Sequence, residues 1–206
     1  MSGNRYATIL IPLLTLALGG CVALSPKPAG SGKVRDVPNE DEMIIKALYY
    51  GQEGKPLQAY EWYERLYKAT DKPEYRLAAL RALLAAKRYD EALRQAQASL
   101  VRYPDDVAIR KIECLSLLHL KRVDDALSCA REVLKREPDN FQNVDLLASI
   151  YLLQGKNEEA YRVYADYYKK HHDDATVLKM ASIRLHRFKE PEKALRLLES
   201  HSKMIG

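Results

Sequence analysis

The chain has 206 residues, of which 47% are hydrophobic and 30% are charged, and its formal net charge is +5. This net charge is mild, and the basic residues alternate with acidic ones, as in Lys87-Arg88-Tyr89-Asp90-Glu91. Such alternation is typical of solvated helix faces, so we expect no nucleic acid among the partners.

The first twenty residues are predicted to be an export signal. They carry one basic residue, Arg5, followed by an uncharged run from Tyr6 to Gly20 that is too short for a convincing membrane span. The sequence Leu18-Gly19-Gly20-Cys21 resembles the lipobox of bacterial lipoproteins. That resemblance implies that the signal, residues 1–20, is cut before Cys21 and that Cys21 becomes the lipid-bearing residue. An ordinary signal or anchor with an incidental cysteine is the alternative.

A tether is predicted to follow the lipidated cysteine, so that residues 21–38 connect the membrane to the folded part. Residues 22–38 are rich in Pro, Gly, Ser and Lys, and a flexible segment of this length reaches roughly 20–25 Å. In many bacterial lipoproteins a residue other than aspartate after the cysteine directs the protein to the outer membrane. Val22 therefore favours the outer membrane over the inner one, with the protein facing the periplasm.

Alanines recur at steps of 33 or 34 residues through the rest of the chain, at Ala59, Ala92, Ala126, Ala160 and Ala194. Apolar residues at helical spacing around them predict two amphipathic helices in each unit. Two antiparallel helices approach closely where side chains are small. Twelve residues before the alanines stand Ala47, Leu80, Cys114, Ala148 and Ser182, and four of these five are small. We expect the small members of these pairs in the core, together with four large tyrosines: Tyr50, Tyr63, Tyr151 and Tyr164.

Turn segments separate the units. Pro104-Asp105-Asp106, Pro138-Asp139-Asn140 and His172-Asp173-Asp174 stand 34 residues apart. Each offers an Asp or Asn side chain that can accept a hydrogen bond from the free N–H groups at the start of the next helix. These segments therefore predict helix N-caps, with either Asp173 or Asp174 as the cap in the last unit.

The pattern resembles the tetratricopeptide repeat, whose signature is a 34-residue helix–turn–helix with an alanine and a large residue in its second helix. Val144-x2-Leu147-Ala148-x2-Tyr151 followed by Ala160-x3-Tyr164 carries the resemblance, although the opening tryptophan is missing from every repeat. The resemblance implies an all-α, right-handed superhelical solenoid over residues 39–206. The five repeats are expected near residues 40–72, 73–106, 107–140, 141–174 and 175–206.

Two further cysteines, Cys114 and Cys129, fall on the two helices of the third repeat. Buried free thiols are the favoured interpretation. A disulfide is the alternative in an oxidising compartment, and the separation of the two Cα atoms would decide between them.

Catalytic motifs are missing from the sequence, which has no Gly-rich phosphate loop, no GxSxG elbow, no HExxH and no CxxC pair. His171-His172-Asp173-Asp174 is the one cluster with metal-ligand residue types, and a capping aspartate already accounts for part of it. We therefore expect no enzymatic activity, no metal and no cofactor.

Protein binding is the remaining class of function. In the family that the chain resembles, the first helix of each repeat lines a concave groove, and the groove positions lie fifteen and eleven residues before each alanine. These positions are Ile44, Leu48, Leu77, Arg81, Lys111, Leu115, Asp145, Ser149, Lys179 and Ile183. The mixture of apolar and singly charged residues suits an extended or helical peptide segment.

The predicted function is a lipid-anchored scaffold that binds another cell-envelope protein and assists assembly or positioning of an envelope complex. A regulatory subunit of an envelope enzyme, such as a peptidoglycan synthase or hydrolase, is the alternative. The last helix should leave Leu195, Leu198, Met204 and Ile205 uncovered, and this edge could also support self-association.

Overall fold

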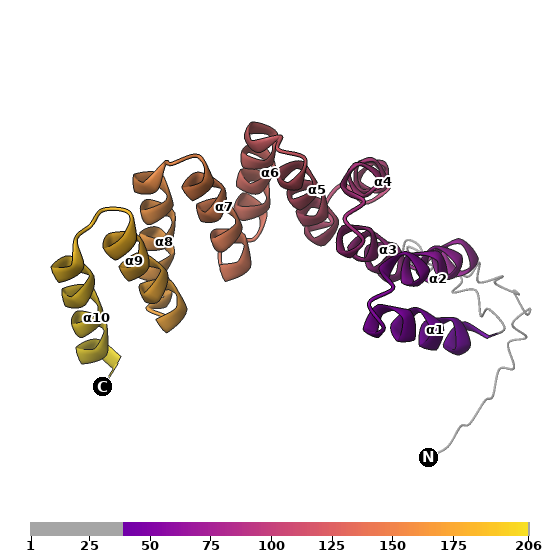
Figure 1. Cartoon of the computed structure of the whole chain (residues 1–206), viewed down its shortest axis with the longest axis horizontal. Coiled ribbons are helices and arrows are strands. Elements are labelled where there is room, and N and C mark those ends of the chain that lie inside the picture. Colours follow the sequence, from indigo (N-terminus) through magenta and orange to yellow (C-terminus); the bar gives the residue numbers. More distant parts are fainter. Residues whose placement is uncertain (1–38, 206) are drawn as a thin grey trace, which may run out of the picture. The chain divides into compact units, whose positions relative to one another are not determined.

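The computed structural model describes residues 39–205 of the chain, and within them the secondary structure consists of ten α-helices without strands. Figure 1 shows them as successive helical hairpins. The helices are α1 (Glu40–Gln52), α2 (Pro56–Thr70), α3 (Pro73–Ala85), α4 (Tyr89–Arg102), α5 (Val107–His119), α6 (Val123–Arg136), α7 (Phe141–Leu153), α8 (Asn157–His171), α9 (Asp174–His186) and α10 (Pro191–Ile205).

Contacts between helices follow the order of the chain. Each helix packs against the next one in sequence, and α3 also contacts α5. The ten helices therefore form five hairpins that bury their faces against neighbouring hairpins, which is the arrangement of a helical solenoid. The predicted all-α solenoid of five helix–turn–helix units is confirmed. None of the described helices is both long and apolar enough to cross a membrane.

The recurring alanines are all buried in the core. Ala92, Ala126 and Ala160 are fully buried, and Ala59 and Ala194 are 2% and 6% exposed. In the first helices, Ala47, Leu80, Cys114 and Ala148 are also fully buried. The predicted burial of these positions is thus confirmed in the first four repeats, and in the second repeat the buried residue is the large Leu80. Tyr151 and Tyr164 are buried as predicted, whereas Tyr50 and Tyr63 are only half-buried.

Ser182 is exposed, so the prediction that it forms the close contact of the fifth repeat is wrong. Ala181 is buried there instead. Helix α8 continues to His171, one residue further than the 34-residue period implies, and α9 starts at Asp174, one residue early. Because the turn between α9 and α10 spans residues 187–190, one residue more than the turn at 154–156, the register is recovered before Ala194.

Three of the first helices begin with the predicted side-chain caps. Asp106 accepts a hydrogen bond from the amide of Ile109 at 2.9 Å, and Asn140 accepts one from Gln142 at 3.0 Å. In the fifth repeat Asp173 is the cap, bonded to the Thr176 amide at 2.9 Å. The caps satisfy N–H groups that have no partner inside the helix, so they help to fix where each repeat starts.

The turn within each hairpin contains one residue with a left-handed backbone. It is glycine at Gly54 and Gly155, whereas Lys87, Lys121 and Lys189 adopt the same conformation with φ of 57°, 64° and 60°. A left-handed backbone costs a residue with a Cβ atom roughly 1–2 kcal/mol, and glycine avoids that cost.

Replacing Lys121 with glycine is therefore expected to stabilise the protein. After subtraction of the larger entropy that glycine loses on folding, the gain should be about 0.5–1 kcal/mol, measurable as a higher melting temperature. The matched control is Gly155→Ala, whose added Cβ meets no atom within 4 Å, so that only backbone strain acts and stability should fall. A lower melting temperature for Lys121→Gly would contradict this account.

Candidate protein-binding surface

The first helices of the repeats present a row of side chains that we call the A-helix surface, defined by the residues fifteen and eleven before each core alanine. Eight of the ten predicted residues are open to solvent in the first four repeats. Leu48 and Arg81 are exposed, and the other six are half-buried: Ile44, Leu77, Lys111, Leu115, Asp145 and Ser149. These side chains can therefore contact a partner.

The fifth repeat differs because of its shifted register. Ile183 is only 4% exposed and belongs to the core cluster that includes Ala160, so its predicted place on the A-helix surface is wrong. Counting one residue back gives Leu178 and Ser182 as the equivalent positions. Leu178 is 58% exposed and Ser182 is also exposed. Lys179 is exposed as predicted, but its side chain turns toward the fourth repeat.

Asp145 is already bound by two neighbours. The Tyr164 hydroxyl of α8 donates a hydrogen bond to its Oδ1 at 2.5 Å, and the Lys179 ammonium of α9 lies 2.7 Å from the same oxygen. Burial raises the pKa of Tyr164, and its bond to the Asp145 carboxylate raises it further. The carboxylate therefore joins α7, α8 and α9, and its charge is largely compensated within the chain.

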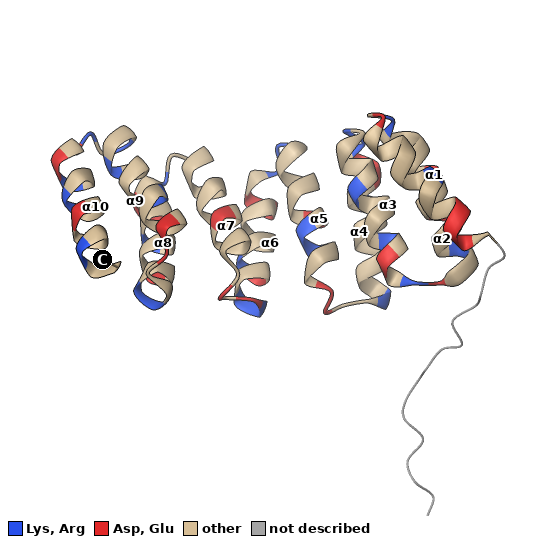
Figure 2. Cartoon of the chain, turned by 90° about the horizontal axis from the view of Figure 1, so that it is seen from below, with Lys and Arg blue, Asp and Glu red and all other residues tan. Residues whose placement is uncertain are grey.

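Arg81 and Lys111 have no such compensation. Among the described residues neither of them makes an ion pair, and they lie on α3 and α5, which contact each other. Leu77 precedes Arg81 by one helical turn, and Leu115 follows Lys111 by one turn, so both apolar side chains lie on the same faces. The middle of the A-helix surface thus combines two cations that form no ion pair among the described residues with apolar side chains. Figure 2 shows that Lys and Arg alternate with Asp and Glu along the described chain.

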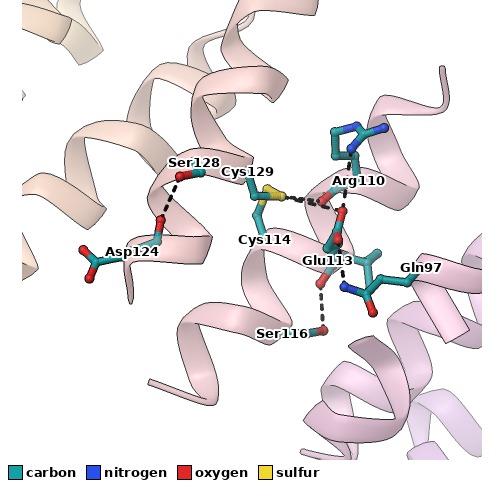
Figure 3. Close-up of a disulfide and its surroundings, with 9 residues drawn as sticks. Gln97, Arg110, Glu113, Cys114, Ser116, Asp124, Ser128 and Cys129 are labelled. Atoms are coloured by element: carbon teal, nitrogen blue, oxygen red, sulfur yellow. Dashed lines mark hydrogen bonds and ion pairs between the residues drawn. A yellow bond between two sulfur atoms is a disulfide. The ribbon is translucent and has the colours of Figure 1, made fainter. Parts of the chain in front are cut away.

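A disulfide joins Cys114 of α5 to Cys129 of α6 (Figure 3). The two Cα atoms are 5.4 Å apart, within the range that a bridge requires. The interpretation of these residues as free thiols is therefore wrong. A bridge that closes a loop of about 15 residues stabilises a fold by about 3 kcal/mol. It also fixes α5, which carries Lys111 and Leu115, against its hairpin partner.

The cluster at residues 171–174 is used in packing. His171 Nε2 lies 3.1 Å from the Asp139 carboxylate, Asp173 caps α9, and Asp174 lies 2.7 Å from Nε2 of the buried His201. Within residues 39–205, no group of three or more His, Cys, Asp or Glu side chains is placed to hold a metal ion. Cys21 and the predicted tether lie outside the described residues.

Known proteins share this architecture. The family model described as the N-terminal TPR repeats region of Psidin matches residues 74–204. Among solved structures, MamA from Desulfovibrio magneticus RS-1 aligns with a TM-score of 0.63 at 14% identity, covering 82% of this chain and 96% of that one. A thermophilic TPR protein of Thermus thermophilus aligns with a TM-score of 0.60 at 16% identity, covering 80% and 90%. No curated protein sequence matches. At these identities the solved structures support the fold alone.

Proposed function

Because the chain belongs to the tetratricopeptide-repeat family, we propose that it is a lipid-anchored scaffold that binds a segment of another cell-envelope protein. The observation that carries this proposal is the uncompensated pair Arg81 and Lys111 beside Leu77 and Leu115 on the A-helix surface. An extended or helical segment with an acidic residue next to a large apolar one would satisfy these side chains. The apolar contact would give most of the affinity, and the charges would fix the register.

The bonds that Asp145 makes within the chain support the choice of an acidic ligand. A free carboxylate one repeat away from the cations would favour a segment with mixed charges, and it would repel an acidic one. Because Lys179 and Tyr164 hold Asp145, the described A-helix surface offers positive charge in its middle without an opposing free acid on the next repeat.

Two independent features support placement in the envelope. The first is the uncharged run that ends at Cys21, which resembles a lipoprotein signal. The second is the disulfide between Cys114 and Cys129, because disulfides persist mainly in exported proteins and are rare in the cytosol of most organisms. The proposal therefore has the protein face the periplasm from a lipid anchor, with the outer membrane favoured by Val22.

Cys21→Ala is expected to abolish the anchor. The variant should accumulate as an unprocessed precursor that takes up no labelled palmitate, whereas the parent protein should be labelled and recovered with membranes. Cys129→Ser, which removes a thiol of the disulfide, is the matched control and should keep the label. If the parent protein incorporates no palmitate, the lipoprotein assignment is wrong.

The scaffold hypothesis and the regulatory-subunit hypothesis predict different partners. Pull-down from detergent-solubilised membranes followed by mass spectrometry should recover an envelope assembly complex if the protein is a scaffold. Recovery of a peptidoglycan synthase or hydrolase whose activity rises or falls on addition of the purified chain would favour the regulatory alternative instead.

A further inference from the structure

Both end helices of the described solenoid expose large apolar side chains. On α10, Leu195, Met204 and Ile205 are exposed as predicted, whereas Leu198 is half-buried. On α1, three apolar side chains are more than half exposed: Ile45, Leu48 and Tyr49. The outer faces of terminal repeats are usually polar, so these two apolar faces are suited to contact with another protein surface.

The exposed residues occupy positions that are covered in other repeats. Leu195 directly follows the core alanine of its repeat and is 58% exposed, whereas Leu93 and Leu127 at the same position are 5% and 6% exposed. Tyr49 stands ten residues before its core alanine and is 52% exposed. With the shift of the fifth repeat taken into account, the residues that correspond to Tyr49 are at most 8% exposed: Ala82, Ser116, Ile150 and Ile183.

These two positions lie on opposite sides of an internal junction between repeats. Leu127 of α6 and Ile150 of α7 belong to one core cluster. At the next junction, Tyr161 of α8 has the position of Leu127, and its hydroxyl accepts a hydrogen bond from Arg184 Nε of α9 at 3.3 Å. Helices α10 and α1 therefore carry the two uncovered halves of a junction of the same kind.

A polar side chain five residues after the core alanine bonds to the next repeat in three of the four internal junctions. The pairs are Glu64 with Arg76 of α3, Gln97 with Glu113 of α5 at 3.1 Å, and Arg131 with Tyr151 of α7 at 2.9 Å. Glu199 holds this position on α10. Its side chain is exposed, and its carboxylate makes no hydrogen bond or ion pair with any of the described residues.

Helix α1 carries suitable partners for that carboxylate. Its Lys46 and Tyr50 stand thirteen and nine residues before the core alanine, as do the bonded residues of α5 and α7. In the geometry of an internal junction, the Lys46 ammonium would lie beside the Glu199 carboxylate, and the Tyr50 hydroxyl could donate a hydrogen bond to it. Lys46 pairs with Glu42 on its own helix at 2.5 Å, but such an exposed pair contributes little energy and leaves Lys46 available.

One contact at the rim of this junction is unfavourable. Glu192 of α10 and Glu53 after α1 stand where Asp124 accepts a hydrogen bond from Gln154 at 2.9 Å. Two acidic side chains would face each other there, and Lys55, which lies 3.9 Å from Glu53, offsets part of the charge. Both acidic residues are exposed, so solvent and salt weaken their repulsion.

From this complementarity we propose that the chain assembles head to tail, with α10 of one copy packed against α1 of a second copy in the manner of an internal repeat junction. The contact uses different faces on the two copies, so each pair leaves a free face at either end and further copies can add. The apolar contact of Leu195 and Tyr49 supplies most of the affinity, and Glu199 with Lys46 fixes the register. The contact does not rest on the proposed function.

Sedimentation velocity of the full chain in detergent micelles tests the assembly. The parent protein is expected to form species larger than a dimer as its concentration rises. Leu195→Glu places a charge in the apolar contact and should weaken assembly roughly tenfold or more. Val101→Glu is the matched control, because Val101 is 86% exposed and lies on α4, outside both end helices. This control should assemble like the parent.

Charge reversal separates loss of a specific contact from loss of folding. Glu199→Lys and Lys46→Glu should each weaken assembly, because each change places like charges opposite each other. The two changes combined in one chain restore opposite charges across the contact. The combined variant should therefore assemble better than either single variant.

Photo-crosslinking identifies what covers α10. The photoreactive amino acid p-benzoylphenylalanine in place of Leu195, in a mixture of unlabelled and isotope-labelled full chains, should give products of mixed isotope content that join α10 to α1. The proposal is overturned if the parent stays monomeric at every concentration, or if the combined charge variant assembles no better than the single variants. It is also overturned if the crosslink joins α10 to residues 1–38 or to a different protein.

Discussion

Reversing the two free charges of the A-helix surface, by Arg81→Glu with Lys111→Glu, is expected to weaken capture of the native partner by about 2–4 kcal/mol. The expected loss is large because both cations lack a partner within the described chain and lie beside apolar side chains, Leu77 and Leu115, that would exclude water from the complex. Introduced carboxylates would also repel an acidic ligand. Pull-down yields and a binding isotherm with the identified partner measure the effect.

The matched control is Lys135→Glu with Arg162→Glu. These exposed residues lie on the second helices α6 and α8, and neither forms an ion pair among the described residues, so the variant makes the same change in net charge elsewhere. Both double variants should keep their helical content and melting temperature. Equal loss of binding in the control would place the working surface elsewhere.

Arg76→Ala is expected to destabilise the first half of the solenoid by about 3–5 kcal/mol, which is the usual cost of breaking a buried ion pair on one side. The side chains of Arg76 and Glu64 are only 12% and 13% exposed, and they pair between α3 and α2. Arg76 also donates to Ser99 Oγ and to the Gln95 carbonyl of α4. Removal of the arginine leaves the Glu64 charge and these acceptors in a poorly hydrated junction, so urea or thermal unfolding should detect the loss.

Two comparisons make this prediction specific. Arg102→Ala breaks the ion pair between Arg102 and Asp71, in which the two side chains are 55% and 54% exposed. Loss of this exposed pair should lower the free energy of unfolding by less than about 1 kcal/mol. The double variant Arg76→Met with Glu64→Leu removes both buried charges, so it should be clearly more stable than Arg76→Ala alone. A similar small cost for Arg76→Ala and Arg102→Ala would mean that water reaches the buried pair.

Much of the fold was predictable because its determinants are local and repeat at a fixed spacing. An alanine where two helices approach, and an Asp or Asn before a helix, act through contacts within one hairpin. The burial of Ala126 and Ala160 and the capping bonds of Asp106 and Asn140 followed directly from this spacing. The same spacing predicted most residues of the A-helix surface, because side chains fifteen and eleven residues before a core alanine lie on one face of the first helix.

Only the tertiary structure showed where the 34-residue spacing assigns residues of the fifth repeat to the wrong positions. The 34-residue period does not show that α8 has one extra residue and that the turn before α10 is one residue longer. Ala194 keeps the same place in the period with or without this shift. The packing of Ala181 and Ile183 in the core selected the shifted register, and this moved Ser182 to the surface. The disulfide likewise depends on the 5.4 Å separation of the Cα atoms of Cys114 and Cys129, which sequence spacing does not fix.

The sequence by itself thus determined the number of repeats and, in the first four of them, the buried contact residues and the face that meets solvent, because each of these properties belongs to a single hairpin. The contacts between hairpins were decided only by the tertiary structure. They include the compensation of Asp145 by Lys179 and Tyr164 and the burial of Arg76 with Glu64. Such contacts join side chains from three helices at once, so their charge balance and the space between them depend on how neighbouring repeats pack.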